Sequence, residues 1–179
     1  MRTLKYAILG MLMQKSMTGY ELMQQFESAL CEFWTANHSQ IYPELKKLTE
    51  GGMVNFKVEI SGNIMEKKVY AITEEGRKDF LAWLAKDDNM APTPKDTFRL
   101  RMFFSNYLAP DRRNKLIQSQ LIQHQLRLEY LVASQSKFPG ALDPSTDAFS
   151  DYLVLLGAIM REEATCHWLE RCLELCNPS

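Results

Sequence analysis

Residues 33–49 read FWTANHSQIYPELKKLT, and this stretch decides the fold that we expect for the chain. A helix that starts at about Ser39 would place Ile41, Leu45 and Leu48 on one face, because they recur at steps of four and three. Its other face carries side chains that can reach base edges and phosphates: Gln40, Tyr42, Lys46 and Lys47. The pattern is typical of the second helix of a helix-turn-helix.

The segments on either side support this interpretation. Residues 4–12 predict a first helix that is buried on most of its surface, and residues 14–17 predict a turn. Thr18 and Glu21 have the spacing of a capping box that opens a second helix, and Gly19 allows a close approach there. Gly51-Gly52 should end the third helix, and Pro43, which has no N–H, should lie in its first turn unless that turn is bent.

A β-hairpin is predicted directly after this helix. Residues 53–60 alternate apolar and polar side chains, residues 61–63 have turn chemistry, and residues 69–72 form the returning strand. The hairpin has the position of a wing, and Lys67 and Lys68 beside its tip are candidates for phosphate contacts. Thr73 should then cap a helix over residues 74–85, which Phe80, Leu81 and Leu84 would pack against the core.

Two prolines and paired aspartates mark a linker at residues 87–95. We therefore expect a winged helix-turn-helix DNA-binding domain over residues 1–86 and a helical domain over residues 96–179. The fold class is mainly α with a small β-hairpin.

The second half predicts helices over residues 96–108, 110–135 and 148–175, with a loop at 137–147. Heptad stripes run along the two long helices, one through Ile117, Leu121, His124, Leu128 and Leu131, the other through Leu155, Ile159, Glu162, Cys166, Leu169, Leu173 and Cys176. One small subdomain should not bury both stripes, so we expect a homodimer through these C-terminal helices. Glu162 should form an ion pair with an arginine of the bundle or bind a ligand hydroxyl, and His124 is expected to be a satisfied interface residue.

Composition narrows the possible functions. A net charge of −1 does not indicate a protein that coats DNA, and no apolar run is long enough for a membrane span. Cys31, Cys166, Cys172 and Cys176 have no metal-site spacing, so we expect no metal, and reduced core residues in a cytoplasmic protein are favoured over a redox sensor. No phosphate loop or nucleophile elbow is present, and neither an enzyme nor a cofactor is expected.

Four segments together resemble the PadR family of winged-helix transcriptional repressors. These segments are residues 34–49, 1–10 (MRTLKYAILG), 18–22 (TGYEL) and 66–70 (EKKVY). The resemblance implies a homodimer that binds double-stranded operator DNA at an inverted repeat, with the third helix in the major groove and the wing on the backbone. The residues placed against DNA are Tyr20, Ser39, Gln40, Tyr42, Lys46, Lys47, Lys67 and Lys68.

The resemblance also implies a phenolic acid effector, such as p-coumaric or ferulic acid, and control of a phenolic acid decarboxylase gene. A phenolic acid needs an apolar slot and a cation for its carboxylate. Candidate pocket residues are Tyr6, Trp34, His38, Phe98, Arg101, Tyr152, Arg161 and Trp168. The aromatic patch around Trp34 and His38 fits a plain core equally well. Two alternatives remain open, a regulator of multidrug efflux that senses another aromatic ligand, and a protein-interaction module whose tail binds a different partner.

Overall fold

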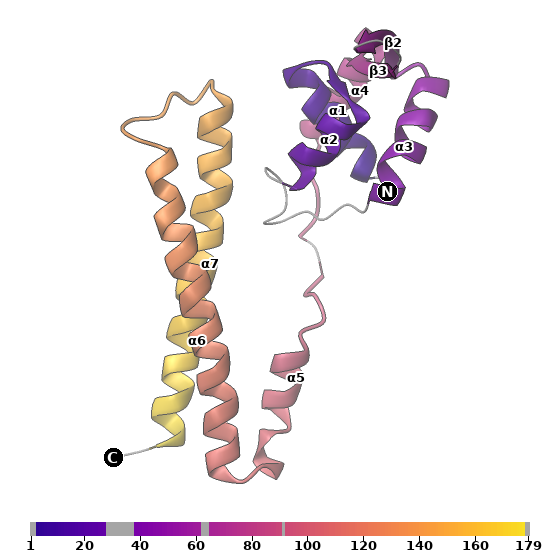
Figure 1. The fold of residues 1–179 in the computed structure, drawn as a ribbon. Helices are drawn as coiled ribbons and strands as arrows, with labels where there is room; N and C mark the ends of the chain where they lie inside the picture. The colour runs from indigo at the N-terminus through magenta and orange to yellow at the C-terminus, as the bar shows by residue number, and fades with distance from the viewer. Residues whose placement is uncertain (1–2, 28–37, 62–64, 91, 178–179) are drawn as a thin grey trace. The chain divides into compact units, whose positions relative to one another are not determined.

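The computed structural model describes residues 3–27, 38–61, 65–90 and 92–177, and Figure 1 shows their helices and strands. The chain forms two compact units, residues 1–91 and 92–179. The first unit contains α1 (Thr3–Gln14), β1 (Met17–Thr18), α2 (Gly19–Gln25), α3 (His38–Glu50), β2 (Val54–Ser61), β3 (Met65–Ile72) and α4 (Glu74–Leu84). The second contains α5 (Thr97–Phe103), η2 (Ser105–Tyr107), α6 (Pro110–Ser134), η3 (Gln135–Lys137) and α7 (Asp147–Cys176).

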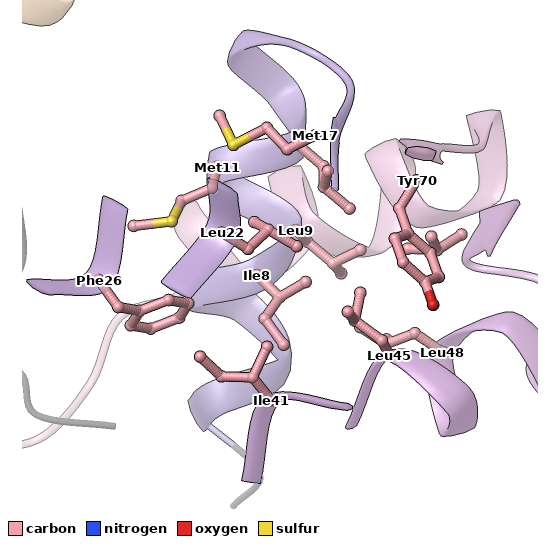
Figure 2. Close-up of a cluster of buried hydrophobic side chains, with 12 residues drawn as sticks. Ile8, Leu9, Met11, Met17, Leu22, Phe26, Ile41, Leu45, Leu48 and Tyr70 are labelled. Carbon is pink, nitrogen blue, oxygen red and sulfur yellow. The ribbon is translucent and has the colours of Figure 1, made fainter. Parts of the chain in front are cut away.

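The core of the first unit lies where α1, α2, α3 and the sheet meet (Figure 2). Ile41, Leu45 and Leu48 of α3 are at most 2% exposed, which confirms the apolar face predicted for this helix. They pack with α1 through Ile8 and Leu9, which are fully buried. This burial fixes the rotation of α3 about its own axis, so its polar face must point to solvent.

The end of α3 is sharply defined by its glycines. Met53 N donates to Leu48 O at 2.9 Å and Gly52 N donates to Thr49 O at 3.1 Å, while Gly52 has a φ of 72°. These are the two hydrogen bonds of a Schellman motif, whose left-handed residue is best supplied by glycine. The predicted stop at Gly51-Gly52 is confirmed. The expectation for Pro43 is wrong, because it lies inside α3, five residues after His38 and beyond the first turn.

The sheet has three strands in the order β1-β3-β2, all antiparallel. The predicted hairpin is present, and β3 is longer than expected because it begins at Met65. The turn expected at residues 14–17 is partly wrong, since Met17 pairs with Tyr70 and Thr18 with Val69 as a short third strand. The predicted hairpin turn, residues 61–63, lies almost wholly outside the described residues.

Helix α4 is held to the end of α3. Thr73 caps α4 as predicted, and Gly76 N donates to its Oγ1 at 3.1 Å. Thr73 N also donates to Met53 O at 3.0 Å, and Thr73 Oγ1 donates to Gly52 O at 2.7 Å. Phe80 packs on the core, but the expected packing of Leu81 and Leu84 is wrong because both are exposed.

In the second unit, α6 and α7 form an antiparallel hairpin (Figure 1). Asn114 at the start of α6 donates from Nδ2 to Oδ1 of Asn177 just after α7, at 2.8 Å. Near the other end, Leu131 packs with Ala158 and Ile159. The two heptad stripes therefore bury each other within one chain, which corrects the argument that they need a partner.

Other apolar side chains of this unit remain exposed. On α6 and α7 they are Ile122, Leu126, Tyr130, Val132, Leu153, Val154, Met160 and Leu175. On α5, on η2 and at the residues next to them they are Leu100, Phe103, Phe104, Tyr107 and Leu108. Within the described residues, no helix is both long and apolar enough to span a membrane.

Candidate nucleic-acid interface

The exposed face of α3 carries the residues that the sequence singled out. Ser39, Gln40, Tyr42, Lys46 and Lys47 are all exposed, because the opposite face of the helix is locked into the core. Nζ of Lys46 lies 3.8 Å from Oε1 of Glu50 in a solvent-exposed pair. Such a pair is weak, so it leaves the lysine available to a phosphate.

Tyr42 has the most strongly determined position on this face. Its side chain is 51% exposed, and its ring rests on Gly19 at the start of α2, where a Cβ would come within 2.5 Å of Cε1 of Tyr42. Burial raises the pKa of the Tyr70 phenol, and the nearby phenol of Tyr42 raises that pKa further. Tyr42 therefore lies between α2 and β3 with one side of its ring open to solvent.

The start of α2 is fixed by the predicted capping box, which is confirmed. Glu21 N donates to Thr18 Oγ1 at 3.1 Å, while Thr18 N and Thr18 Oγ1 donate to Glu21 Oε2 at 2.7 and 2.8 Å. The backbone N–H of Thr18 is the main cause that lowers the pKa of Glu21, and the charges of Lys15 and Lys67 lower it further. The turn therefore stands beside two cations.

Tyr20 follows this cap and is 61% exposed. Its hydroxyl accepts a hydrogen bond from Nε2 of Gln24 at 3.1 Å, one turn further along α2. The phenol thus has an oriented hydroxyl at the end of the helix that neighbours α3. Sequence analysis did not select Lys15, whose charge acts on the same turn. Its only sequence signal is its place three residues before the predicted cap Thr18.

Lys67 and Lys68 are both exposed on β3, but their side chains point to opposite faces of the hairpin. Lys68 stands with Nζ 4.4 Å from the centroid of the Phe56 ring, across the hairpin on β2. Lys67 acts on the carboxylate of Glu21 at the start of α2. The two lysines can therefore contact phosphates on opposite faces of the wing, and they do not act side by side on one phosphate.

Taken together, these elements present one polar helix face and a basic hairpin on the same small unit. The helix can enter a major groove, where side chains read base edges, and lysines on the hairpin can neutralise phosphates. No group of three or more His, Cys, Asp or Glu residues in the described parts of the chain is placed to hold a metal ion.

The candidate effector residues fall into separate places. Tyr6 in the first unit stacks on Trp83, with ring centroids 4.4 Å apart and an angle of 4° between the planes. Trp34 lies outside the described residues, as does the His38 side chain. In the second unit, Phe98 meets Trp168 edge to face at 6.0 Å.

Tyr152 meets Phe138 at 5.7 Å, near the loop that joins α6 to α7. Phe98 and Trp168 lie near the opposite end of the hairpin, so the second unit does not bring these candidates into one pocket. Arg161 is exposed on α7. Arg101, exposed on α5, lines a groove that α5 forms with the start of α6.

Glu162 is one member of a polar cluster inside the helical hairpin. Its Oε1 lies 3.1 Å from Nε of Arg127, and its Oε2 lies 2.5 Å from Nδ1 of His124. The predicted ion pair with an arginine of the bundle is confirmed, and His124 is satisfied by the same carboxylate. With both oxygens engaged, Glu162 is a structural residue of the seam and not a free ligand for a hydroxyl.

The cysteines of the second unit behave as core residues. Cys166 is buried, and Cys172 and Cys176 are partly buried against the same cluster. Burial raises the pKa of the Cys166 and Cys172 thiols. Because the thiolate is the reactive form, these thiols are poorly suited to redox sensing. Cys31 lies outside the described residues.

A helix-turn-helix whose second helix leads into a β-hairpin defines the winged helix-turn-helix class of DNA-binding proteins. Residues 8–82 match the Transcriptional regulator PadR-like family, and residues 94–177 match the Virulence activator alpha C-term family. The chain is 39% identical to the negative transcriptional regulator PadR of Bacillus subtilis, over 98% of each chain. This protein therefore belongs to the PadR-like family of transcriptional regulators, which are not enzymes.

Two solved structures of the Bacillus subtilis protein are also similar. Its complex with operator DNA matches with a TM-score of 0.93 and 38% identity, over 98% of this chain and 100% of that chain. Its complex with p-coumaric acid matches with a TM-score of 0.89 and 36% identity, over 98% of this chain and 99% of that chain.

Proposed function

We propose that this protein is a dimeric repressor that binds an inverted-repeat operator through α3 and the wing. The observation that carries the proposal is the position of Tyr42 on the exposed face of α3. Its ring is held on Gly19 and half exposed, beside Gln40, Lys46 and Lys47. The operator complex of the similar Bacillus subtilis regulator supports the same use of the unit. Tyr42 and Gln40 read bases, while Tyr20, Ser39 and the lysines hold the backbone.

The homodimer forms through the C-terminal helices. The support is the set of exposed apolar side chains on α6 and α7. Exposed apolar surface of this kind is typical of a protein–protein interface. A two-fold dimer presents two α3 helices to the two half-sites of an inverted repeat. Removal of residues 146–179 should abolish the dimer, and a stable dimer of residues 1–145 would contradict this role of α7.

The effector is a phenolic acid such as p-coumaric or ferulic acid, and the regulated gene encodes a phenolic acid decarboxylase. The p-coumaric acid complex of the Bacillus subtilis relative supports the class of effector. Within the second unit, Phe98 and Trp168 supply aromatic faces, and Arg101 or Arg161 supplies the cation for the carboxylate. Binding shifts the dimer toward a form whose α3 helices no longer fit both half-sites.

The decisive experiment measures binding of the purified full chain to the DNA upstream of its own gene while p-coumaric acid is added. Release at sub-millimolar acid, with no release by benzoate as matched control, is expected. Tight binding that ignores the acid would keep the DNA-binding function and replace the effector by another aromatic ligand, as in a regulator of multidrug efflux. A chain that binds no DNA would remove the proposal.

A pair of variants tests the role of Tyr42. Tyr42→Ala should weaken operator binding by ~1 to 3 kcal/mol per half-site and leave binding to random DNA nearly unchanged. Tyr42→Phe keeps the ring on Gly19 and removes only the hydroxyl, so it separates ring contact from hydrogen bonding. Equal losses on operator and random DNA would show that Tyr42 reads no base.

A further inference from the structure

Cys172 and Cys176 form a pair of thiols on the last turns of α7. They are four residues apart, so they lie one above the other on the same face of the helix. Both are free thiols, partly buried against the cluster that contains Ile117 and Leu169. Burial is the larger cause that raises the pKa of the Cys172 thiol, and the nearby Cys176 raises it further. The two sulfur atoms are therefore close enough to bind one ligand together.

A polar atom of α6 lies buried at the same end of the helical hairpin. Oδ1 of Asn114 accepts no hydrogen bond from any residue that the structure describes. Nδ2 of the same amide donates to Oδ1 of Asn177 at 2.8 Å, so the amide stands beside the residue that follows Cys176. A buried acceptor without a donor is rare, because it has lost water and gained no partner. Such an atom is typical of a place where a bound group supplies the missing hydrogen bond.

This set of donors does not suit the common structural metals. Zinc takes four ligands in a tetrahedron, whereas the described parts of the chain offer no group of three or more His, Cys, Asp or Glu residues. Copper(I) held by two thiolates keeps a negative charge, which the apolar cluster around the thiols disfavours. A suitable centre is soft, takes two sulfur ligands, brings a third ligand of its own and ends up neutral. Trivalent arsenic, which enters as As(OH)₃, has these properties.

We propose that Cys172 and Cys176 bind trivalent arsenic as a dithiol, with Asn114 accepting a hydrogen bond from the hydroxyl that the arsenic retains. Two As–O bonds break and two As–S bonds form. Each thiol proton leaves with a hydroxide as water, so the product is the neutral (RS)₂As–OH, and neither arsenic nor sulfur changes its oxidation state. The retained hydroxyl gives Oδ1 of Asn114 the donor that it lacks.

The surroundings of the two thiols favour this reaction over oxidation. Oxidation needs the thiolate, which burial of Cys172 disfavours. Condensation with As(OH)₃ consumes the protonated thiol, because its proton departs in the water that is formed. The neutral product also removes the repulsion between two neighbouring sulfur charges. The inference is independent of the proposed operator and effector, since it uses neither the face of α3 nor an aromatic ligand.

Titration of the full chain with arsenite tests the dithiol. Binding is followed by the near-ultraviolet absorbance of the As–S bonds and by the mass of the intact chain, and we expect one arsenic per wild-type chain. Cys172→Ser and Cys176→Ser each leave a single thiol of the pair. Arsenite affinity should then fall about a hundredfold, because the second sulfur of a tethered pair binds at a high effective concentration. Cys166→Ala removes the other cysteine of α7 and, as the matched control, should bind arsenite like the wild type.

A second probe isolates the role of Asn114. Phenylarsine oxide condenses with the same two thiols, but its arsenic carries a phenyl group where arsenite keeps a hydroxyl. Asn114→Ala should therefore weaken arsenite binding about tenfold and leave the binding of phenylarsine oxide nearly unchanged. Equal arsenite affinities of Asn114→Ala and the wild type would overturn the role of Asn114.

Folding and DNA binding provide the remaining readouts. Arsenite should raise the melting temperature of the wild-type chain, because it binds the folded state, and should not raise that of the Cys172→Ser, Cys176→Ser double variant. Circular dichroism shows whether each variant is folded. Without arsenic, the single serine variants should bind the operator like the wild type, so failure of the proposed function and failure of this site are seen separately. Wild-type arsenite affinity in either serine variant, or no arsenic bound to the wild-type chain, would overturn the proposal.

Discussion

The ring of Tyr42 lies so close to Gly19 that a Cβ on this glycine would come to 2.5 Å from Cε1 and 2.9 Å from Cζ of the ring. Real Cβ contacts are not that short, so one of the two groups must move when any side chain is placed at Gly19. The glycine is required here by space and not by its φ, because the positive φ values of the described glycines belong to Gly52 and Gly140.

Gly19→Ala should therefore displace the Tyr42 ring from its place on α2. We expect operator affinity to fall about tenfold while affinity for random DNA changes little, because the ring that we propose to read a base is displaced and the lysines are not. Fluorescence anisotropy with both DNAs measures the difference. Gly157→Ala is the matched control, since its Cβ would meet only the end of the Arg161 side chain at 3.5 Å. If Gly19→Ala binds the operator with wild-type affinity, the contact between Gly19 and the Tyr42 ring does not matter for operator binding.

The wing lysines should act through phosphates. Lys67→Ala combined with Lys68→Ala is expected to weaken operator and random DNA alike, and to reduce the slope of log affinity against log salt by about one to two per chain. The affinity is measured over a series of salt concentrations. Lys78→Ala with Lys86→Ala removes the same charge from exposed sites on and after α4 and is the control. An unchanged slope in the wing variant would take Lys67 and Lys68 out of the DNA contact.

Gly76→Ala should destabilise the first unit. A Cβ at Gly76 would come within 2.1 Å of the carbonyl oxygen of Met53, which also accepts the hydrogen bond from Thr73 N. Relief needs a backbone shift, and we expect the free energy of unfolding in urea to fall by about 2 kcal/mol or more. Gly157→Ala in the middle of α7 is again the control, and it should be neutral or stabilising by up to about 1 kcal/mol. Equal effects of the two substitutions would contradict the steric argument.

The cap of α2 should give stability that depends on pH. The Thr18 backbone N–H holds the pKa of Glu21 below its ordinary value of 4.5, so folding favours the ionised carboxylate. The resulting stability is complete above the unfolded-state pKa and is lost as the pH falls through the lower folded-state pKa. Glu21→Gln should therefore flatten the fall of the unfolding free energy between about pH 5 and pH 3.

Urea unfolding at several pH values measures this slope, with Glu163→Gln on α7 as the control for an exposed glutamate. An unchanged slope in Glu21→Gln would show that the capping box does not contribute to the pH dependence. The substitution should also lower stability near pH 7, where the wild-type carboxylate is fully ionised.

Periodicity predicted the buried face of α3 because Ile41, Leu45 and Leu48 recur at helical spacing and therefore all face the core. It also predicted the caps, because Thr18 and Thr73 make their hydrogen bonds three residues away in sequence. Features that depend only on residues close together in the chain can be predicted from the local sequence. For this reason the long helices of both units and the β2–β3 hairpin could be predicted from the sequence.

Features made by distant pairing could not be obtained in this way. Two residues are too few for a period, so β1 becomes a strand only because β3 lies beside Met17 and Thr18. Leu81 and Leu84 were predicted to pack on the core because they are apolar, but both are exposed, since only the Phe80 side of α4 faces the core. In the candidate site, Gly19 and Tyr42 were each selected, while their contact across 23 residues of sequence was not.

The hydrogen bonds around Thr73 have a mechanical meaning. Thr73 joins the end of α3, the start of β2 and the start of α4, because it donates hydrogen bonds to Gly52 O and Met53 O and accepts one from Gly76 N. These hydrogen bonds tie α3, the wing and α4 together at one residue. We therefore expect the first unit to bind DNA and to leave it as one body, so that α3 and the wing lysines would lose their proposed contacts together.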